Sequence, residues 1–271
     1  MFADAVEIAS AFTFPYVGLR ARPDGTVDSV VASFVVLNAD GWIATSAHVI
    51  EEIVASGGLA REDVDAPAVR AGDVAGHVEI WALPGFDSTR PRLSRGRVNP
   101  VADIAIGRIE PFHPDVVLGY PVLRDTAKRP LRPGESVCRL GFPFHRVAAE
   151  YEAQRNDFRL APDAFPAPLF ALDGIVSRFN RVAGPHGQAL FIETSTPGLR
   201  GQSGGPLLDT EGRVTGIQSR TAHLDLGFDA HYAAGSAEEG TERQFLNVGM
   251  ASHVDELVRM LEMDGVSFAR G

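Results

Sequence analysis

The sequence lacks most features of a secreted or membrane-bound protein. Cys138 is the only cysteine among 271 residues, so no disulfide can form within the chain. No apolar run reaches the roughly 20 residues needed to cross a bilayer. The N-terminal segment has no Lys or Arg before Arg20, whereas a secretory signal begins with basic residues and continues with an apolar core. Disulfides are rare in reducing compartments, and we therefore expect a cytoplasmic location and no membrane partner.

The sequence also lacks a basic segment. Its formal net charge is −10 and its pI is near 5.3, and it has no run of Lys and Arg that could follow a phosphate backbone. Nucleic acid is therefore not an expected partner. His223 and His231 share a segment with Asp225 and Asp229, but the spacing is not that of a metal site. We expect neither a metal nor a cofactor.

Glycine and proline are plentiful. The 28 Gly and 18 Pro residues are spread evenly, which favours many turns and short strands over long helices. Asp40-Gly41 between two apolar segments is a hairpin signal. Near the end of the chain, apolar residues fall on one helical face, with Ser252 as the expected N-cap. The pattern predicts an all-β protein with two antiparallel barrels and a short C-terminal α-helix.

The predicted organisation has four parts, divided by a segment rich in Pro and Arg. They are an N-terminal β-barrel over residues 15–120, a linker over 121–135, a C-terminal β-barrel over 136–250 and a helix over 251–264. Residues 145–170 are interpreted as an inserted loop, with a helical turn around residues 150–158. Residues 221–243 are interpreted as a long polar loop.

Three short segments carry the candidate chemistry. Gly201-Gln202-Ser203-Gly204-Gly205-Pro206 places a serine among glycines, where other groups can approach its hydroxyl closely. A serine hydroxyl is a weak nucleophile unless a base takes its proton and a third group orients that base. Among the eight histidines, only His48 lies between a predicted hairpin and a short helix. Asp103 opens an apolar strand and is suited to burial beside an imidazole.

These segments occur in the order His, Asp, Ser, and they resemble the triad motifs of serine proteases of the trypsin/chymotrypsin fold. Further likeness is to the HtrA-type branch of that family. The matching segments are Asp40-Gly41-Trp42-Ile43-Ala44-Thr45-Ser46-Ala47-His48-Val49, Gly141-Phe142-Pro143-Phe144, Asp173-Gly174-Ile175-Val176-Ser177 and Gly204-Gly205-Pro206-Leu207-Leu208. The resemblance implies a chymotrypsin-like fold, in which each of the two antiparallel barrels has six strands.

The resemblance also implies the role of each candidate residue. Ser203 would attack a peptide carbonyl, and His48 would act first as base and then as acid. Asp103 would orient His48, and Ser219 matches the serine that supports the triad aspartate. The expected oxyanion hole comprises Gly201, Gln202 and Ser203, with the N–H groups of Gly201 and Ser203 as donors.

The substrate pocket is also placed by the resemblance. Pro197 stands where trypsin-like enzymes carry the acid that captures Lys or Arg, so basic specificity by that device is disfavoured. A small or medium apolar side chain before the cut is the expected preference. Arg220 could favour an acidic residue, but it is expected to point to solvent. The expected pocket residues are Thr196, Pro197, Gly198, Gln218 and Arg220.

Some features differ from the family pattern. Gln202 is uncharged where secreted members carry the aspartate that pairs with a newly cut N-terminus, so zymogen activation is not expected. The chain ends soon after its predicted terminal helix, and no PDZ domain is expected. Ordering of a loop or binding of a regulatory protein is the expected control, with residues 56–76, 145–170 and 221–243 as candidate loops.

Two alternative functions compete with an endopeptidase that cleaves a protein or peptide substrate. Gly201-Gln202-Ser203-Gly204-Gly205 matches the nucleophile elbow of α/β-hydrolase esterases. That motif needs a helix directly after the serine, and its acid and histidine must follow the serine in sequence. Gly204-Gly205-Pro206 is a poor helix start, and the candidate residues His48 and Asp103 precede Ser203. The second alternative is a catalytically latent or non-enzymatic module that keeps the protease fold for binding.

Overall fold

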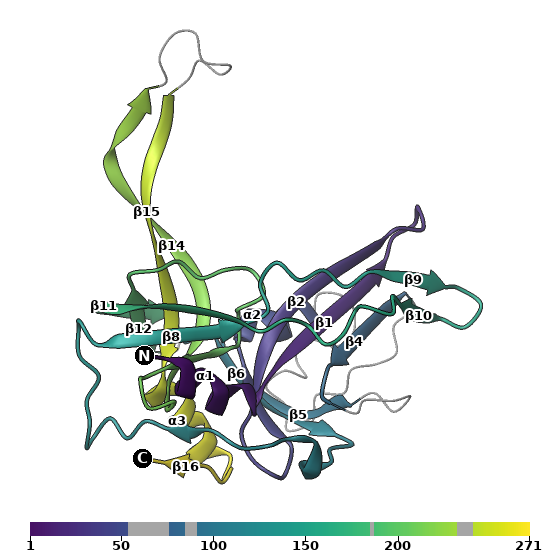
Figure 1. The fold of residues 1–271 in the computed structure, drawn as a ribbon, viewed down its shortest axis with the longest axis horizontal. Coiled ribbons are helices and arrows are strands. Elements are labelled where there is room, and N and C mark those ends of the chain that lie inside the picture. Colours follow the sequence, from purple (N-terminus) through teal and green to yellow (C-terminus); the bar gives the residue numbers. More distant parts are fainter. Residues whose placement is uncertain (54–75, 85–90, 185–186, 232–240) are drawn as a thin grey trace.

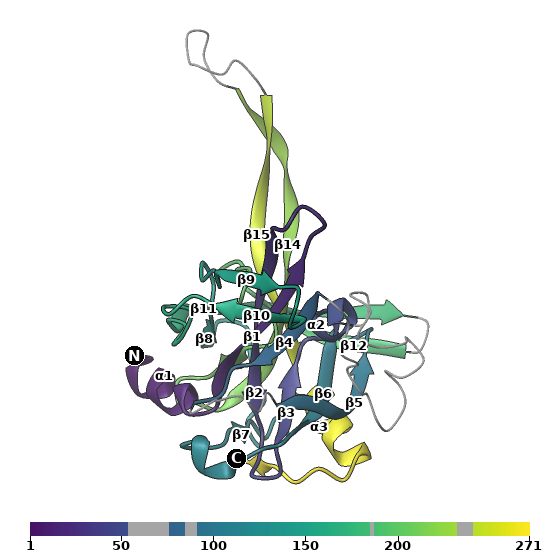
Figure 2. The same ribbon diagram turned by 90° about the vertical axis from the view of Figure 1, so that its right-hand side faces the viewer.

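The computed structural model describes residues 1–53, 76–84, 91–184, 187–231 and 241–271. Two large, mainly antiparallel sheets form the body of the molecule. They lie side by side in Figure 1, and one lies in front of the other in Figure 2. The predicted all-β, chymotrypsin-like fold is confirmed. In the described part of the chain, no helix is long and apolar enough to cross a membrane.

The first sheet has six strands in the order β4-β1-β2-β3-β6-β5. The Asp40-Gly41 turn joins β2 to β3 as predicted, and Gly41 has φ +81°, which glycine adopts without strain. Trp81 packs on Phe34 at a ring distance of 5.2 Å in the interior of this sheet. The strands are β1 (Thr13–Ala21), β2 (Val27–Val36), β3 (Trp42–Thr45), β4 (His77–Trp81), β5 (Arg92–Asn99) and β6 (Ile104–Glu110).

The second sheet closes into a ring of six strands. The order β13-β8-β11-β12-β15-β14 is completed by pairing between β13 and β14, as the chymotrypsin-like fold predicts. The two short strands β7 (Val122–Leu123) and β16 (Ala269–Arg270) extend the sheet beyond β14. The ring strands are β8 (Ser136–Gly141), β11 (Phe170–Gly184), β12 (Gly187–Thr194), β13 (Pro206–Leu208), β14 (Val214–His231) and β15 (Thr241–His253).

A hydrophobic core joins the two sheets. Ile104 of the first sheet and Leu140 and Phe191 of the second belong to one buried cluster, and each is fully buried. Burial of apolar area is the main force that holds such elements together. The core therefore fixes the two sheets against each other at the place where the candidate residues meet.

Three α-helices and a single turn of 3₁₀ helix flank the sheets in the described residues. They are α1 (Ala3–Ser10), α2 (Ala47–Ile53), α3 (Val254–Met263) and η3 (Pro114–Val116). The predicted terminal helix is present, but the N-cap expected at Ser252 is wrong. His253 caps α3 by accepting from the N–H of Asp255 at 3.2 Å, because the hydroxyl of Ser252 donates to the carbonyl of Ala102 instead.

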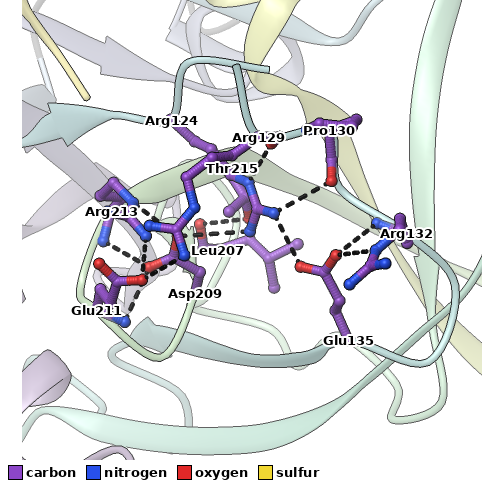
Figure 3. Close-up of polar contacts among 10 residues, drawn as sticks. All are labelled: Arg124, Arg129, Pro130, Arg132, Glu135, Leu207, Asp209, Glu211, Arg213 and Thr215. Carbon is purple, nitrogen blue, oxygen red and sulfur yellow. Dashed lines mark hydrogen bonds and ion pairs between the residues drawn. The ribbon is translucent and has the colours of Figure 1, made fainter. Parts of the chain in front are cut away.

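The segment between the sheets is packed against the second barrel. Arg124 follows β7 and is buried, and its guanidinium donates to Glu135 at 2.9 Å and forms an ion pair with Asp209 at 3.4 Å (Figure 3). It also donates to the carbonyl of Arg129 at 2.9 Å. A buried guanidinium needs such partners to offset its loss of hydration. This network attaches the segment to β13 and β8.

Two segments interpreted as loops form hairpins. The helical turn around residues 150–158 is wrong, because β9 (Ala149–Glu152) pairs with β10 (Asp157–Leu160). The segment interpreted as a long polar loop is instead a ribbon in which β14 runs to His231 and β15 starts at Thr241. The ribbon projects away from both sheets (Figures 1 and 2). Polar and apolar residues do not alternate regularly along the ribbon, so the sequence pattern did not predict these strands.

Candidate active site

The candidate acid and base lie in contact at the junction of the two sheets. His48 stands in the first turn of α2, and Asp103 immediately precedes β6. The His48 Nδ1 atom lies 3.0 Å from each carboxylate oxygen of Asp103. The backbone N–H of His48 also donates to Asp103 Oδ1 at 3.0 Å. The imidazole is therefore held by its ring and its backbone to one carboxylate.

Asp103 is buried and fully engaged. It is 6% exposed, and φ +49° places it in the left-handed region, which aspartate tolerates better than most residues. The Ser219 hydroxyl donates to its Oδ2 atom. Burial by itself would raise the pKa of Asp103, but hydrogen bonds and charge attraction from His48, with the bond from Ser219, lower it below its ordinary value. The carboxylate is thus ionised at neutral pH.

Ser203 lies in the loop that precedes β13. Its hydroxyl donates to the backbone carbonyl of Ser219 at 3.2 Å. Ser219 therefore contacts two of the three candidate catalytic residues, Asp103 through its side chain and Ser203 through its carbonyl. The structure brings His48, Asp103, Ser203 and Ser219 together.

Gly201 shapes a tight turn before Ser203. The N–H of Gln202 donates to the carbonyl of Leu199 at 3.0 Å, and Gly201, the third residue of this turn, has φ +96°. This combination defines a type II turn, which requires glycine at that position. A Cβ on Gly201 would also overlap the carbonyl of Phe142. Glycine is therefore needed at position 201 for two independent reasons.

The turn leaves two backbone donors without an internal acceptor. Within the described residues, neither the N–H of Gly201 nor that of Ser203 donates to another group. Gln202, which we expected in the same group, is placed differently, because its N–H is bound to Leu199 and its Oε1 atom accepts from the N–H of Leu199 at 3.0 Å. Gln202 supports the turn, and its neighbours present the free donors.

The first sheet supports this loop through Ser33, which the sequence analysis missed. The N–H of Ser33 in β2 donates to the carbonyl of Ser203 at 2.8 Å, and its hydroxyl donates to the carbonyl of Gly201 at 2.7 Å. Thr45 in turn donates to the carbonyl of Ser33 at 2.8 Å. Ser33 is one of several small polar residues in its strand, so no local signal could single it out.

A cleft of about 710 Å³ opens beside these residues. Its lining includes His48, Asp103, Ser203 and Ser219, with Pro197, Gly198, Gln218 and Arg220 from the predicted pocket. Thr196 does not line it, and the residues that line it without having been predicted include Leu199, Arg200, Thr221 and Met250.

Two of the predicted pocket residues have additional contacts. The side-chain amide of Gln218 donates to the carbonyl of Leu140 at 2.7 Å and is buried, so it braces the wall of the cleft. Arg220 is exposed, and its guanidinium carbon lies 5.2 Å from the centre of the Phe191 ring. A cation over an aromatic face is attracted by the ring, so Arg220 is held against the protein surface.

With this geometry in place, comparison with known families is direct. The family model described as trypsin-like peptidase domain matches residues 32–217, which is more than half of the chain. The chain therefore belongs to the trypsin-like peptidase family, as the motifs predicted. No curated protein matches the sequence at a significant level.

Solved structures give the same fold. The chain is similar to "HtrA-type protease AlgWS227A with tripeptide", at 19% identity and a TM-score of 0.53, over 97% of this chain and 62% of that one. It is similar to "HtrA-type protease AlgW with tripeptide" with the same identity and TM-score, over 98% of this chain and 65% of that one. The chain thus spans less than two thirds of the length of these neighbours. The predicted likeness to HtrA-type proteases is confirmed at the level of the fold.

Proposed function

We propose that this protein is a serine endopeptidase that cleaves peptide bonds through Ser203, His48 and Asp103. The observation that carries the proposal is the hydrogen-bonded set in which Asp103 holds the Nδ1 atom of His48 while Ser219 contacts both Asp103 and Ser203. Membership of the trypsin-like peptidase family supports the same reaction. A peptide substrate is further supported by the similar AlgW structures, which are described with a tripeptide.

The reaction follows from the roles of these groups. His48 takes the proton of Ser203 as its oxygen attacks the carbonyl carbon, and Asp103 stabilises the imidazolium that forms. The imidazolium then gives that proton to the leaving amine as the C–N bond breaks, leaving an ester on Ser203. Water, deprotonated by His48, attacks the ester and releases the acid product and the free serine.

The negative oxygen of each tetrahedral intermediate needs donors that are already in position. The N–H groups of Gly201 and Ser203 are the donors proposed here, because both lack an acceptor in the described part of the chain. Preorganised donors of this type contribute roughly 10²–10³-fold each to the rate. Ser33 holds the carbonyl of Gly201 and so orients the peptide unit that follows this donor.

Control by loop ordering or by a partner protein is part of the proposal. Of the three candidate loops, residues 145–170 include the β9–β10 hairpin, and residues 221–243 include most of the ribbon of β14 and β15. Residues 56–75 lie outside the described residues. The activity of a protease must be controlled in any compartment, because potential protein substrates are abundant.

A fluorophosphonate reagent tests the proposed reaction. We expect covalent labelling of the wild-type chain and none of Ser203→Ala or His48→Ala. Ser10→Ala is the matched control, since Ser10 is exposed on α1 and bonds only to the carbonyl of Glu7 among the contacts described. Absence of labelling in the wild type, with peptides and under varied conditions, would instead favour a non-enzymatic binding module.

The esterase alternative has little support from the fold. The nucleophile elbow leads directly into a helix, whereas the segment after Ser203 enters β13. The residues that contact one another at the site also occur in the order His48, Asp103, Ser203, whereas the nucleophile elbow requires the acid and the histidine to follow the serine. Hydrolysis of a thioester or p-nitrophenyl ester, together with no hydrolysis of any peptide, would support the esterase alternative.

A further inference from the structure

Arg139 of β8 is a buried cation without an acidic partner. It is 2% exposed, and no carboxylate in the described residues forms an ion pair with it. Its Nη1 atom donates to the carbonyl of Thr196 at 2.7 Å, while its Nη2 atom is buried with no hydrogen-bond partner. Burial lowers the pKa of Arg139 to about 10, so the side chain remains charged at neutral pH.

The isolation of this charge is unusual within the same protein. Arg124 is buried to a similar degree, and it is paired with both Glu135 and Asp209. Moving a charge out of water is costly, and proteins normally offset that cost with a counter-charge and a full set of hydrogen bonds. Among the described residues Arg139 has neither, so the part of the chain that the structure describes leaves its charge without compensation.

The position of Arg139 shows where such a counter-charge would bind. Thr196, whose carbonyl accepts from Arg139, directly precedes the cleft residue Pro197. The guanidinium also packs on Gly249, where an added Cβ would overlap both Nη atoms. Gly249 pairs across β14 and β15 with Thr221, another residue of the cleft. Arg139 therefore lies behind the inner end of the cleft, where these segments meet.

The walls of the cleft converge at the same point. The hydroxyl of Thr221 donates to the carbonyl of Gly198 at 2.7 Å, and the N–H of Gly249 donates to the carbonyl of Thr196 at 2.9 Å. Residues 196–198 and 219–221 are thereby joined to β15. Arg139 itself lies behind these joined segments, in contact with Thr196 and Gly249.

The remaining charges of the cleft do not neutralise Arg139. Its acidic lining residues are Glu51, on α2, and Asp103, which is bonded to His48. Two further arginines, Arg200 and Arg220, line it and are exposed. The cleft thus presents positive charge on the side that holds residues 197–200 and 220.

We propose that Arg139 determines specificity and that the enzyme cleaves after an acidic residue, whose carboxylate is drawn to the guanidinium at the inner end of the cleft. This inference rests on the proposed function. It differs from the apolar side chain expected from the sequence, because the motifs placed Pro197 and Arg220 at the pocket but not Arg139. A charge in the interior is screened less than one in water, so it acts strongly over the short distance to the cleft.

Peptide libraries in which only the residue before the cut is fixed test this preference. We expect Glu and Asp to exceed their uncharged counterparts Gln and Asn by roughly 10- to 100-fold in kcat/KM, the range of a charge-assisted hydrogen bond. The ratio of kcat/KM for Glu to that for Asp indicates how long the substrate side chain must be to interact with Arg139. A ratio near one for both pairs, or a preference for apolar residues, would overturn the proposal.

Substitutions assign the preference to one residue. Arg139→Met should reduce the Glu/Gln ratio to near one, and Arg139→Lys should keep part of it, because the charge is retained without the planar fork. Arg220→Ala should keep the ratio, although this residue lines the cleft. A ratio that survives in Arg139→Met and disappears in Arg220→Ala would refute the role of Arg139.

Further measurements separate this inference from the proposed function. Fluorophosphonate labelling of Ser203 together with equal cleavage after Glu and Gln would contradict the role of Arg139 alone. If no labelling occurs, the proposed function fails. The affinities of matched Glu and Gln peptides for Ser203→Ala then still test whether the cleft prefers an acidic side chain. Equal binding would then overturn the inference. Arg139→Gln is a second uncharged variant in case Arg139→Met does not fold.

Discussion

Asp103 and Arg139 are two buried charges near one cleft, and they differ in how many hydrogen bonds the protein makes to them. Asp103 accepts from the backbone and ring of His48 and from the hydroxyl of Ser219. The guanidinium of Arg139 has one described hydrogen bond, to the carbonyl of Thr196, and its Nη2 atom has none. Both are nearly inaccessible to solvent. The number of internal partners is therefore what distinguishes them.

This difference separates two uses of a buried charge. A carboxylate whose lone pairs are filled by the protein cannot turn toward a ligand, so it orients the donors that hold it. A guanidinium with an unfilled donor keeps part of its capacity to bind a carboxylate from elsewhere. We interpret Asp103 as a group that positions His48, and Arg139 as a group that selects substrates.

The largest expected effect comes from removing the charge of Asp103. Asp103→Asn keeps the shape of the side chain, but its amide can donate to His48 and favour the wrong tautomer. As in serine proteases of this fold, we expect kcat to fall by about 10⁴-fold while the fold is kept. Steady-state hydrolysis and circular dichroism check the two halves of this expectation. Activity close to that of wild type would show that His48 does not depend on Asp103.

The two buried arginines should differ in their effect on stability. Arg124→Met removes one of the two cations bound to each of Glu135 and Asp209, which keep Arg132 and Arg213 as partners. We expect a loss of about 1–3 kcal/mol in the free energy of unfolding, because buried hydrogen-bonding groups lose a partner. Arg139→Met leaves no charge unpaired, so we expect its stability to equal or exceed that of wild type. Urea denaturation of both variants gives the comparison directly. Similar losses in the two would contradict the view that Arg139 has no internal partner.

The hydroxyl of Ser33 should have a smaller effect on catalysis. Ser33→Ala removes the bond to the carbonyl of Gly201 but keeps the backbone bond to the carbonyl of Ser203. We expect kcat to fall roughly 3- to 10-fold, with little change in the Glu/Gln ratio, because the turn that carries the oxyanion donors becomes less well ordered. Ser94→Ala, at an exposed hydroxyl that bonds only to the carbonyl of Arg108 among the contacts described, is the control.

The smallest expected effect is on the pH dependence of stability. The pKa of Asp103 is lowered in the folded chain, whereas the pKa of an aspartate in the unfolded chain is about 3.9. Its stabilising contribution is therefore complete above that value and is lost as the pH falls through the lower, folded pKa. We expect the stability of wild type to decrease more than that of Asp103→Asn on acidification below about pH 4. Parallel denaturation curves would show that the pKa is not lowered.

Local sequence signals predicted a large part of the fold. The Asp40-Gly41 turn and the terminal helix α3 depend on turn chemistry or on the apolar pattern of neighbouring residues. The strands missed were those without such a pattern. They are β1, β5, β9, β10 and the outer parts of β14 and β15, whose polar and apolar residues do not alternate regularly, and the two-residue strands β7 and β16.

The order and composition of the motifs determined by themselves the family, the two-barrel fold and the residues proposed to react. Only the tertiary structure decided how that chemistry is supported and directed. Ser33 reaches Gly201 across 168 positions of sequence, and Arg139 reaches Thr196 across 57. Whether a buried charge has a partner depends on such distant contacts, because every strand of a barrel takes its neighbours from other parts of the chain. No local pattern could therefore show that Asp103 is fully bonded and Arg139 is not.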